Sequence, residues 1–275
     1  MKQLKTRGEK TPEYFLGIEL EGTDPNYLGG GPERNVTMVS FRRQILSESD
    51  PVVYKTCFDG GGIEVALLPV TPKWLTVESN VKRITSIVRI FDKLKLITDR
   101  STSAGMHVHI SKTAYDTETF LKLLDFLAAS HDKISKFTGR TRNHHYSRSR
   151  ALSNAEKNQI ADHVKSFTNT KKGVFAKTNR ETVGDNFLAI NRKGYPTIEF
   201  RCFQATSDVK KFFANVEFVI ACREFVYSKL FEANWNAFYN FVEKNKKDFK
   251  NLYAVLGKLG LTTIEAKKSV SAVVC

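Results

Sequence analysis

Acidic, imidazole and guanidinium side chains recur at alternate positions in short, otherwise apolar segments of the chain. The side chains in question are Glu19 and Glu21, Glu64, His107 and His109, and Glu199 and Arg201. Two carboxylates on alternate residues of a strand lie roughly 7 Å apart on the same face. Their like charges repel unless a cation lies between them. The pattern therefore predicts either a bound metal or a pairing arginine beside these acids.

Each of these segments is expected to be a strand with one apolar face and one chemically active face. The segments span residues 14–21, 62–67, 105–110 and 197–202. In all of them hydrophobic residues occupy every second position, and successive side chains of a strand point to opposite faces. If the strands share one sheet, its apolar face packs on helices and its other face gathers the chemical groups. We expect that second face to be the active site.

The donor types on this face indicate which ligand would bind there. His107 and His109, at positions i and i+2 of a strand, can both reach one metal ion, as can a carboxylate from a neighbouring strand. Several carboxylates supply hard oxygen ligands, which suit Mg²⁺ or Mn²⁺, and nucleotide phosphates can complete the coordination. The inventory favours a divalent metal with ATP over zinc. The alternative is an acidic sheet face that is simply exposed to solvent.

A second candidate binding element is the basic segment 138–150, which contains four arginines and two histidines. Arginine forks match phosphate and carboxylate groups in bidentate geometry. The segment is therefore either an anion-binding arm, with Arg140, Arg142 and Tyr146 as its first candidates, or a solvated loop. Both interpretations remain open at the level of sequence.

Composition limits the classes of protein and partner. With 275 residues, 41% of them hydrophobic, the chain can bury a substantial core. The formal net charge of +14 favours an anionic partner such as ATP, an acidic metabolite or nucleic acid. The four cysteines have no CxxC spacing, which argues against a zinc ribbon. Neither a long apolar run nor an apolar N-terminal segment is present, so we expect no membrane span and a cytoplasmic location.

Periodicity places the remaining elements. We expect a flexible basic N-terminus over 1–12, a catalytic domain over 13–231 and a C-terminal helical extension over 232–275, packed on the same domain. Thr71-Pro72 is typical of a helix start, and apolar spacing continues that helix to about Leu96. Further expected helices lie near 120–130, 153–167, 208–231 and 234–257. Further expected strands lie at 36–45 and 51–58, and a hairpin at 186–201.

The ordered motifs resemble the amidoligase family, which belongs to the carboxylate-amine ligases with the glutamine synthetase and glutamate-cysteine ligase fold. The resemblance covers about residues 14–231 and depends on the order in which four short motifs follow one another. The motifs are Gly17-Ile18-Glu19-Leu20-Glu21, Asp59-Gly60-Gly61-Gly62-Ile63-Glu64 with Pro69, Gly105-Met106-His107-Val108-His109, and Asn186 to Ile190 leading into Thr197-Ile198-Glu199-Phe200-Arg201. Two departures occur: Cys-Phe-Gln-Ala-Thr follows Arg201 without a glycine before the threonine, and the basic loop has no Tyr-Cys pair.

The resemblance implies an α+β fold, with a curved, mostly antiparallel sheet around ATP and metal ions and helices on its apolar face. It implies that Glu19, Glu21, Glu64 and Glu199 bind metal. His107 would join the metal or act in catalysis with Glu199, and His109 would add to the nucleotide site. Arg201 would hold the transferred phosphoryl group. The activity implied is amide-bond formation through an acyl phosphate, from a small-molecule or peptide carboxylate and an amine.

Two other functions compete with this reading. A metal-dependent hydrolase or nuclease would use the same Glu and His set to activate water, and its basic surface would bind phosphodiesters. A non-catalytic nucleic-acid-binding protein would need only the positive charge and stacking aromatics. The second rival leaves the alternating acids unexplained, because they would repel a phosphate backbone.

Overall fold

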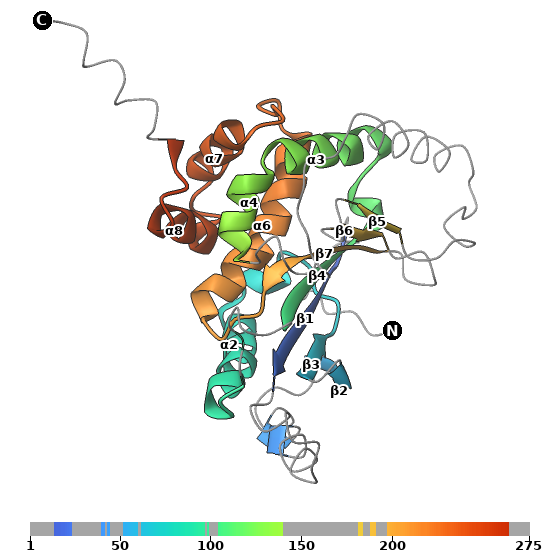
Figure 1. Ribbon diagram of the computed structural model, residues 1–275, viewed down its shortest axis with the longest axis vertical. Helices are drawn as coiled ribbons and strands as arrows, with labels where there is room; N and C mark the ends of the chain where they lie inside the picture. The colour runs from blue at the N-terminus through green and yellow to red at the C-terminus, as the bar shows by residue number, and fades with distance from the viewer. Residues whose placement is uncertain are drawn as a thin grey trace, which may run out of the picture.

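The fold is α+β, with one antiparallel sheet and a layer of helices on one side of it (Figure 1). The computed structural model describes residues 14–23, 40–41, 43–44, 52–59, 62–96, 98, 104–139, 181–183, 188–190 and 197–263. All structural statements below concern these residues. The expected helix at 153–167, the N-terminus 1–12 and residues 264–275 lie outside them.

The sheet has the strand order β2-β3-β1-β4-β7-β6-β5. All of its pairs are antiparallel, which confirms the predicted sheet type. The strands are β1 Leu16–Thr23, β2 Val53–Asp59, β3 Gly62–Leu67, β4 Gly105–Ser111, β5 Glu181–Val183, β6 Leu188–Ile190 and β7 Thr197–Gln204. The segments singled out for their chemistry therefore form β3, β1, β4 and β7, which are consecutive neighbours in the sheet.

Alternation along the strands gives the sheet its apolar face. On β1, Leu16, Ile18 and Leu20 are buried, whereas the residues between them are partly exposed. The same apolar face continues through Val65 on β3 and Val108 on β4, both fully buried. Burial of these side chains, each contributing about 1.5–3 kcal/mol, fixes the register, because a slip by one residue would turn them to the other face.

Six helices longer than one turn lie on the apolar side of the sheet within the described residues (Figure 1). They are α2 Glu78–Lys93, α3 Thr117–Ala129, α4 His131–Thr138, α6 Val209–Tyr227, α7 Trp235–Lys244 and α8 Lys250–Lys258. Of these, α4 contacts β7 directly. Helix α6 contacts β4, α2, α3, α7 and α8. Its buried Asn215 donates from Nδ2 to the sulfur of Met106 on β4, at 3.5 Å. Buried residues of α7 and α8 belong to the same hydrophobic core cluster as those of the strands.

Two predicted elements are wrong in the described residues. The helix expected from Thr71 is interrupted: a 3₁₀ turn, η2 (Trp74–Thr76), is followed by an extended Val77 before α2 begins. The Asn80 side chain donates to the Trp74 carbonyl and stabilises this break. The strand expected over 36–45 is helical at positions 40–41 and 43–44. There Phe41 is fully buried and packs edge-on against Phe91 of α2, at 5.4 Å between ring centroids.

In the part of the chain that the structure describes, none of the helices has the length and hydropathy that a membrane span needs.

Candidate active site on the polar face of the sheet

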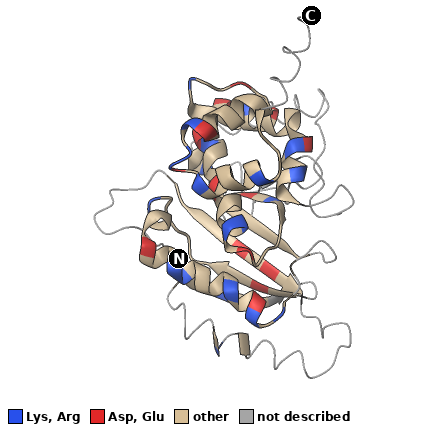
Figure 2. Ribbon diagram, turned by 90° about the vertical axis from the view of Figure 1, so that its left-hand side faces the viewer, with Lys and Arg blue, Asp and Glu red and all other residues tan. Residues whose placement is uncertain are grey.

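The strand register brings the predicted chemical residues together on the face opposite the helices. Glu19 lies directly across from His107 in the β1–β4 pair, and Glu21 lies across from Glu64 in the β1–β3 pair. His109 lies across from Glu199 in the β4–β7 pair. Figure 2 shows acidic positions of the strands close together, whereas lysines and arginines are concentrated on the helices. The polar face therefore gathers side chains from segments up to 180 residues apart in sequence, from Glu19 to Glu199.

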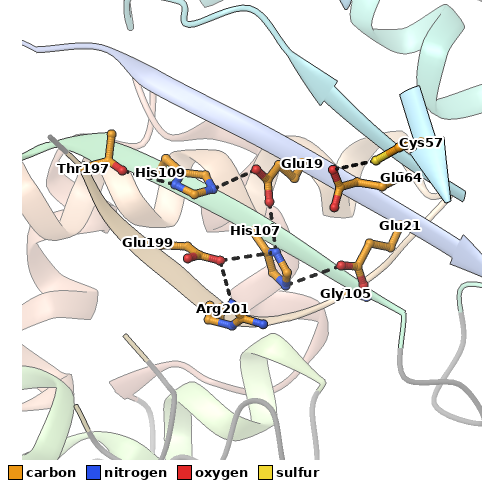
Figure 3. Close-up of polar contacts among 10 residues, drawn as sticks. All are labelled: Glu19, Glu21, Cys57, Glu64, Gly105, His107, His109, Thr197, Glu199 and Arg201. Atoms are coloured by element: carbon orange, nitrogen blue, oxygen red, sulfur yellow. Dashed lines mark hydrogen bonds and ion pairs between the residues drawn. The ribbon is translucent and has the colours of Figure 1, made fainter. Parts of the chain in front are cut away.

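His107 occupies the centre of the acidic group (Figure 3). Its Nδ1 lies 3.2 Å from Glu19 Oε2 and 3.4 Å from Glu199 Oε1. Its Nε2 lies 3.9 Å from Glu21 Oε1. The imidazole is only 6% exposed, so these carboxylates provide most of its polar surroundings. An imidazole in this position can donate a ring N–H to one of these carboxylates and link the strands that carry them.

Arg201 provides the permanent positive charge of the site. Its Nη1 donates to Glu199 Oε1 at 3.2 Å. The Glu199 side chain is 4% exposed, and a carboxylate so deeply buried requires a charged partner. Arg201 contacts this acid through Nη1, and a planar guanidinium is the side-chain group that matches phosphate and carboxylate oxygens in bidentate geometry.

His109 completes the most compact set of potential metal ligands in the described chain. Its Nε2 lies 3.3 Å from Glu19 Oε1, and its Nδ1 lies 3.4 Å from the hydroxyl of Thr197. One ligand atom from each of Glu19, His109 and Glu199 can be chosen such that all lie within 4.8 Å of one another. Two carboxylates and one imidazole form a donor set that suits Mg²⁺ or Mn²⁺ when phosphate oxygens or water complete the coordination.

Gly17 makes room for His109. It lies across from His109 in the β1–β4 register, and a β-carbon on Gly17 would come within 3.3 Å of the His109 β-carbon. The absence of a side chain at this position lets the imidazole lie over β1 toward Glu19. Glycine at position 17 is therefore needed for the packing of His109, and it does not form a turn.

The electrostatic balance keeps Glu19 ionised. Burial alone would raise the pKa of Glu19, but the hydrogen bonds and positive charge of His107 and His109 outweigh it and hold this pKa well below its usual range. Glu19 is therefore an anion at neutral pH although its side chain is only 28% exposed. An anionic carboxylate is the form that binds a divalent cation.

The other two predicted carboxylates are held separately. The backbone N–H of Gly105 donates to Glu21 Oε2 at 2.6 Å, which orients this acid toward His107. The Cys57 thiol on β2 donates to Glu64 Oε1 at 3.5 Å. Burial, followed by the nearby Glu64 charge, raises the pKa of Cys57, so the thiol stays protonated and serves as a donor. Figure 3 shows Glu64 on the same side of the sheet as Glu19 and Glu21.

The structure thus brings together most residues that the sequence singled out. Arg140, Arg142 and Tyr146, predicted to bind ATP, lie outside the described residues, although Gly139 just before them forms a bridge to Phe203 on β7. The remaining candidates share the polar face: Glu19, Glu21, Glu64, His107, His109, Glu199 and Arg201. Their predicted roles as ligands or catalysts remain predictions. The compact donor set contains His109, which the sequence allowed either at the metal with His107 or at the nucleotide.

Thr197 and Cys57 also contribute to the polar face, and sequence reasoning assigned neither to the site. Thr197 could have been found, because it precedes Glu199 by two residues and therefore shares its face. Cys57 gave no such signal, since its contact with Glu64 follows from the β2–β3 register.

The fold and the site define an antiparallel α+β protein whose polar sheet face carries a candidate set of metal ligands. The sequence pattern of the family described as "Putative amidoligase enzyme" matches residues 70–222, more than half of the chain. The chain belongs to this amidoligase family. His107, His109, Glu199 and Arg201 lie within the matched range, and β1 adds Glu19 and Glu21 to them through the sheet. None of the curated proteins matches the chain.

Proposed function

We propose that this amidoligase is an ATP- and Mg²⁺-dependent carboxylate-amine ligase that forms an amide through an acyl phosphate. The observation that carries the proposal is the convergence of Glu19, His109 and Glu199, three potential metal ligands, beside the guanidinium of Arg201. A divalent cation and a guanidinium at one site are what transfer of a phosphoryl group requires, because negative charge must be stabilised on the transferring oxygens.

The residues present fit a divalent cation. Glu19 is an anion, Glu199 is a buried carboxylate, and His109 offers a ring nitrogen within the same small volume. Glu21 and Glu64 lie beside this set and are oriented by Gly105 and Cys57. When bound, Mg²⁺ or Mn²⁺ would offset the negative charge of the ATP phosphates.

The reaction follows from the chemistry of the substrates. An oxygen of the substrate carboxylate attacks the γ-phosphorus of ATP, and the bond to ADP breaks. The amine then attacks the acyl carbon, and the bond to inorganic phosphate breaks as the amide forms. Arg201 would bind oxygens of the transferring phosphoryl group, which positions it and stabilises its charge. His107, between carboxylates and nearly buried, would take up the proton that the amine loses.

The decisive experiment measures ADP release by the purified protein with Mg-ATP and pooled carboxylic acids and amines, and detects new masses in the same reaction. We expect ADP release that requires both an acid and an amine, with a product mass equal to their sum minus water. Glu19→Gln should abolish it. Glu78→Gln, an exposed acid on α2 paired with Lys82, is the matched control and should not.

Two results would contradict the proposal. Metal-dependent cleavage of a phosphodiester or another bond without ATP would indicate the hydrolase or nuclease alternative. ADP release at the same rate in wild type and Glu19→Gln would mean that the carboxylates of the sheet are not part of the site.

A further inference from the structure

Two register irregularities lie on either side of the candidate site. In the β2–β3 pair, Val53 is opposite Leu67 but Lys55 is opposite Ala66, so Tyr54 is an extra residue on β2. In the β4–β7 pair, Met106 is opposite Phe203 and Val108 is opposite Phe200, so two residues of β7 face His107. Such bulges redirect side chains and are frequent next to active sites.

The β2 bulge determines which way Lys55 points. Without the extra residue, the register set by Val53 would place Lys55 opposite Val65, on the apolar face. With it, Lys55 lies opposite Ala66 and shares its face with Cys57, whose thiol contacts Glu64. Tyr54, the extra residue, is 52% exposed. The irregularity therefore moves a lysine from the core side to the polar face.

Lys55 then belongs to a row that crosses the sheet. Lys55 is opposite Ala66, Ala66 is opposite Glu19, and Glu19 is opposite His107. His107 in turn faces the β7 bulge, which includes Arg201. Adjacent strands are about 4.8 Å apart, so the two ends of the row are roughly 19 Å apart along the sheet. Lys55 and Arg201 thus lie at the two ends of the row, with Glu19 and His107 between them.

Lys55 is exposed at the edge of the polar face and lies near its acids. Ala66, between Lys55 and Glu19, carries only a methyl group, and Lys55 itself is exposed. Contact with Cys57, followed by the negative charges of Glu64 and Glu19, raises the pKa of Lys55. The side chain is therefore a cation that the acids of the row attract.

We propose that Lys55 is a substrate-binding residue, whose ammonium binds an anionic carboxylate or phosphoryl oxygen on the polar face, at the opposite end of the row from Arg201. The proposal rests on the proposed function in that it assigns a second anion contact to the same site. A lysine on an edge strand can also serve only to prevent pairing with another sheet. The position of Lys55 beyond Ala66 and Glu19 gives it a ligand-binding role in addition.

Binding measurements separate this proposal from the activity. The probes are inorganic tripolyphosphate for the phosphoryl source and glutarate for the carboxylate source, each titrated by calorimetry in the presence of Mn²⁺. Lys55→Met keeps the length of the side chain and removes its charge, and Lys55→Arg retains the charge. Lys82→Met on α2, where the lysine is 74% exposed and pairs with Glu78, is the matched control.

We expect Lys55→Met to weaken one of the two probes at least tenfold, with Lys55→Arg restoring most of the affinity and Lys82→Met binding as wild type does. Loss of tripolyphosphate affinity assigns Lys55 to the nucleotide, and loss of glutarate affinity alone assigns it to the acid substrate. Affinity for Mn²⁺ alone should not fall, because Lys55 is a cation and no ligand.

The proposal is overturned if wild type binds neither probe, or if Lys55→Met binds both as tightly as Lys82→Met. It is also overturned if Lys55→Met only increases self-association, which is the result expected for an edge lysine. These outcomes differ from failure of the ligase assignment, which would leave the Lys55-dependent anion binding intact while no amide is formed.

Discussion

His107 and Glu19 lie directly across the β1–β4 pair, with 3.2 Å between Nδ1 and Oε2. This contact joins a residue inside the range matched by the amidoligase family to one that precedes it by more than 50 positions. The same imidazole also contacts Glu199 on the other side of β4. The β1–β4–β7 part of the sheet is therefore one electrostatic unit, and replacing any member changes the environment of the others.

Arg201 tests whether the guanidinium has a specific role in this unit. Arg201→Lys keeps a positive charge beside Glu199 but loses the planar fork, so we expect ADP release to fall about 100-fold, or roughly 2.7 kcal/mol, with little loss of stability. Arg201→Met leaves the buried Glu199 without its guanidinium partner and should lower the free energy of unfolding by about 3 kcal/mol. Steady-state kinetics and urea unfolding measure the two effects. Normal turnover in Arg201→Lys would mean that the arginine serves the fold alone.

Two glycines of β1 offer a matched comparison between the two faces of the sheet. A β-carbon on Gly22 would lie 2.7 Å from the Phe91 ring, which is fully buried in α2. Gly22→Ala should therefore cost about 1–3 kcal/mol of unfolding free energy and leave Mn²⁺ affinity per folded molecule unchanged.

A β-carbon on Gly17 would instead approach His109 at 3.3 Å, a distance that a small shift of the imidazole relieves. We expect Gly17→Ala to weaken Mn²⁺ binding about tenfold and to lower stability by less than about 1 kcal/mol. Calorimetric Mn²⁺ titration and urea unfolding of both variants give the comparison. The same response in both glycine variants would contradict the separation of the two faces.

The composition of the polar face could be predicted from sequence because it depends on local alternation. Glu19, His107 and Glu199 each sit on a strand whose other face is continuously apolar, and the period of two fixes their direction. The sequence also predicted that these strands share one sheet. The observed register sets Glu19 opposite His107 and His109 opposite Glu199, so their side chains do lie on a common face.

Features that depend on tertiary contacts could not be predicted in this way. Simple alternation puts Lys55 on the same face as Val53, whereas the extra residue Tyr54 separates them. The break at Val77 depends on the Asn80 contact with Trp74, and the burial of Phe41 depends on Phe91. In each case the structure depends on a contact with another segment or on the strand register, and the pattern within one segment gives no information about either.

Glu217 provides a pH-dependent test of how the C-terminal helices are held. This α6 residue accepts hydrogen bonds from Asn251 Nδ2 at 2.6 Å and from the Leu252 N–H at 2.7 Å, in the first turn of α8. Burial raises the pKa of Glu217 above 4.5 despite these donors. An acid with a raised folded-state pKa binds its proton more tightly in the folded chain. Its contribution to stability is therefore fully present below pH 4.5 and is lost as the pH rises through the folded-state pKa.

Urea unfolding of wild type and Glu217→Gln between pH 4 and 7 measures this contribution. The stability of wild type relative to the glutamine variant should decline as the pH rises, and Mn²⁺ affinity should be the same in both. If wild type instead gained stability relative to the glutamine variant as the pH rises, the hydrogen bonds from α8 would outweigh burial and lower the pKa of Glu217.

The two histidines should respond in opposite ways to metal, because they have different positions in the site. His109 belongs to the compact donor set with Glu19 and Glu199, so His109→Asn should lower Mn²⁺ affinity about 10- to 100-fold. The stabilisation that Mn²⁺ provides at a fixed concentration should fall accordingly, by about 1.4 to 2.7 kcal/mol where Mn²⁺ is in large excess over its dissociation constant.

His107 is the donor shared by Glu19 and Glu199 and approached by Glu21, so His107→Asn leaves like charges close together without it. The metal-free variant should be less stable than wild type, and Mn²⁺ should recover more stability than it adds to wild type, because the cation then offsets a larger repulsion. Thermal unfolding of wild type and both variants, with and without Mn²⁺, measures these changes. If Mn²⁺ raises the unfolding temperature less in both variants than in wild type, His107 is a direct metal ligand. If Mn²⁺ raises it equally in all three proteins, neither histidine binds the metal.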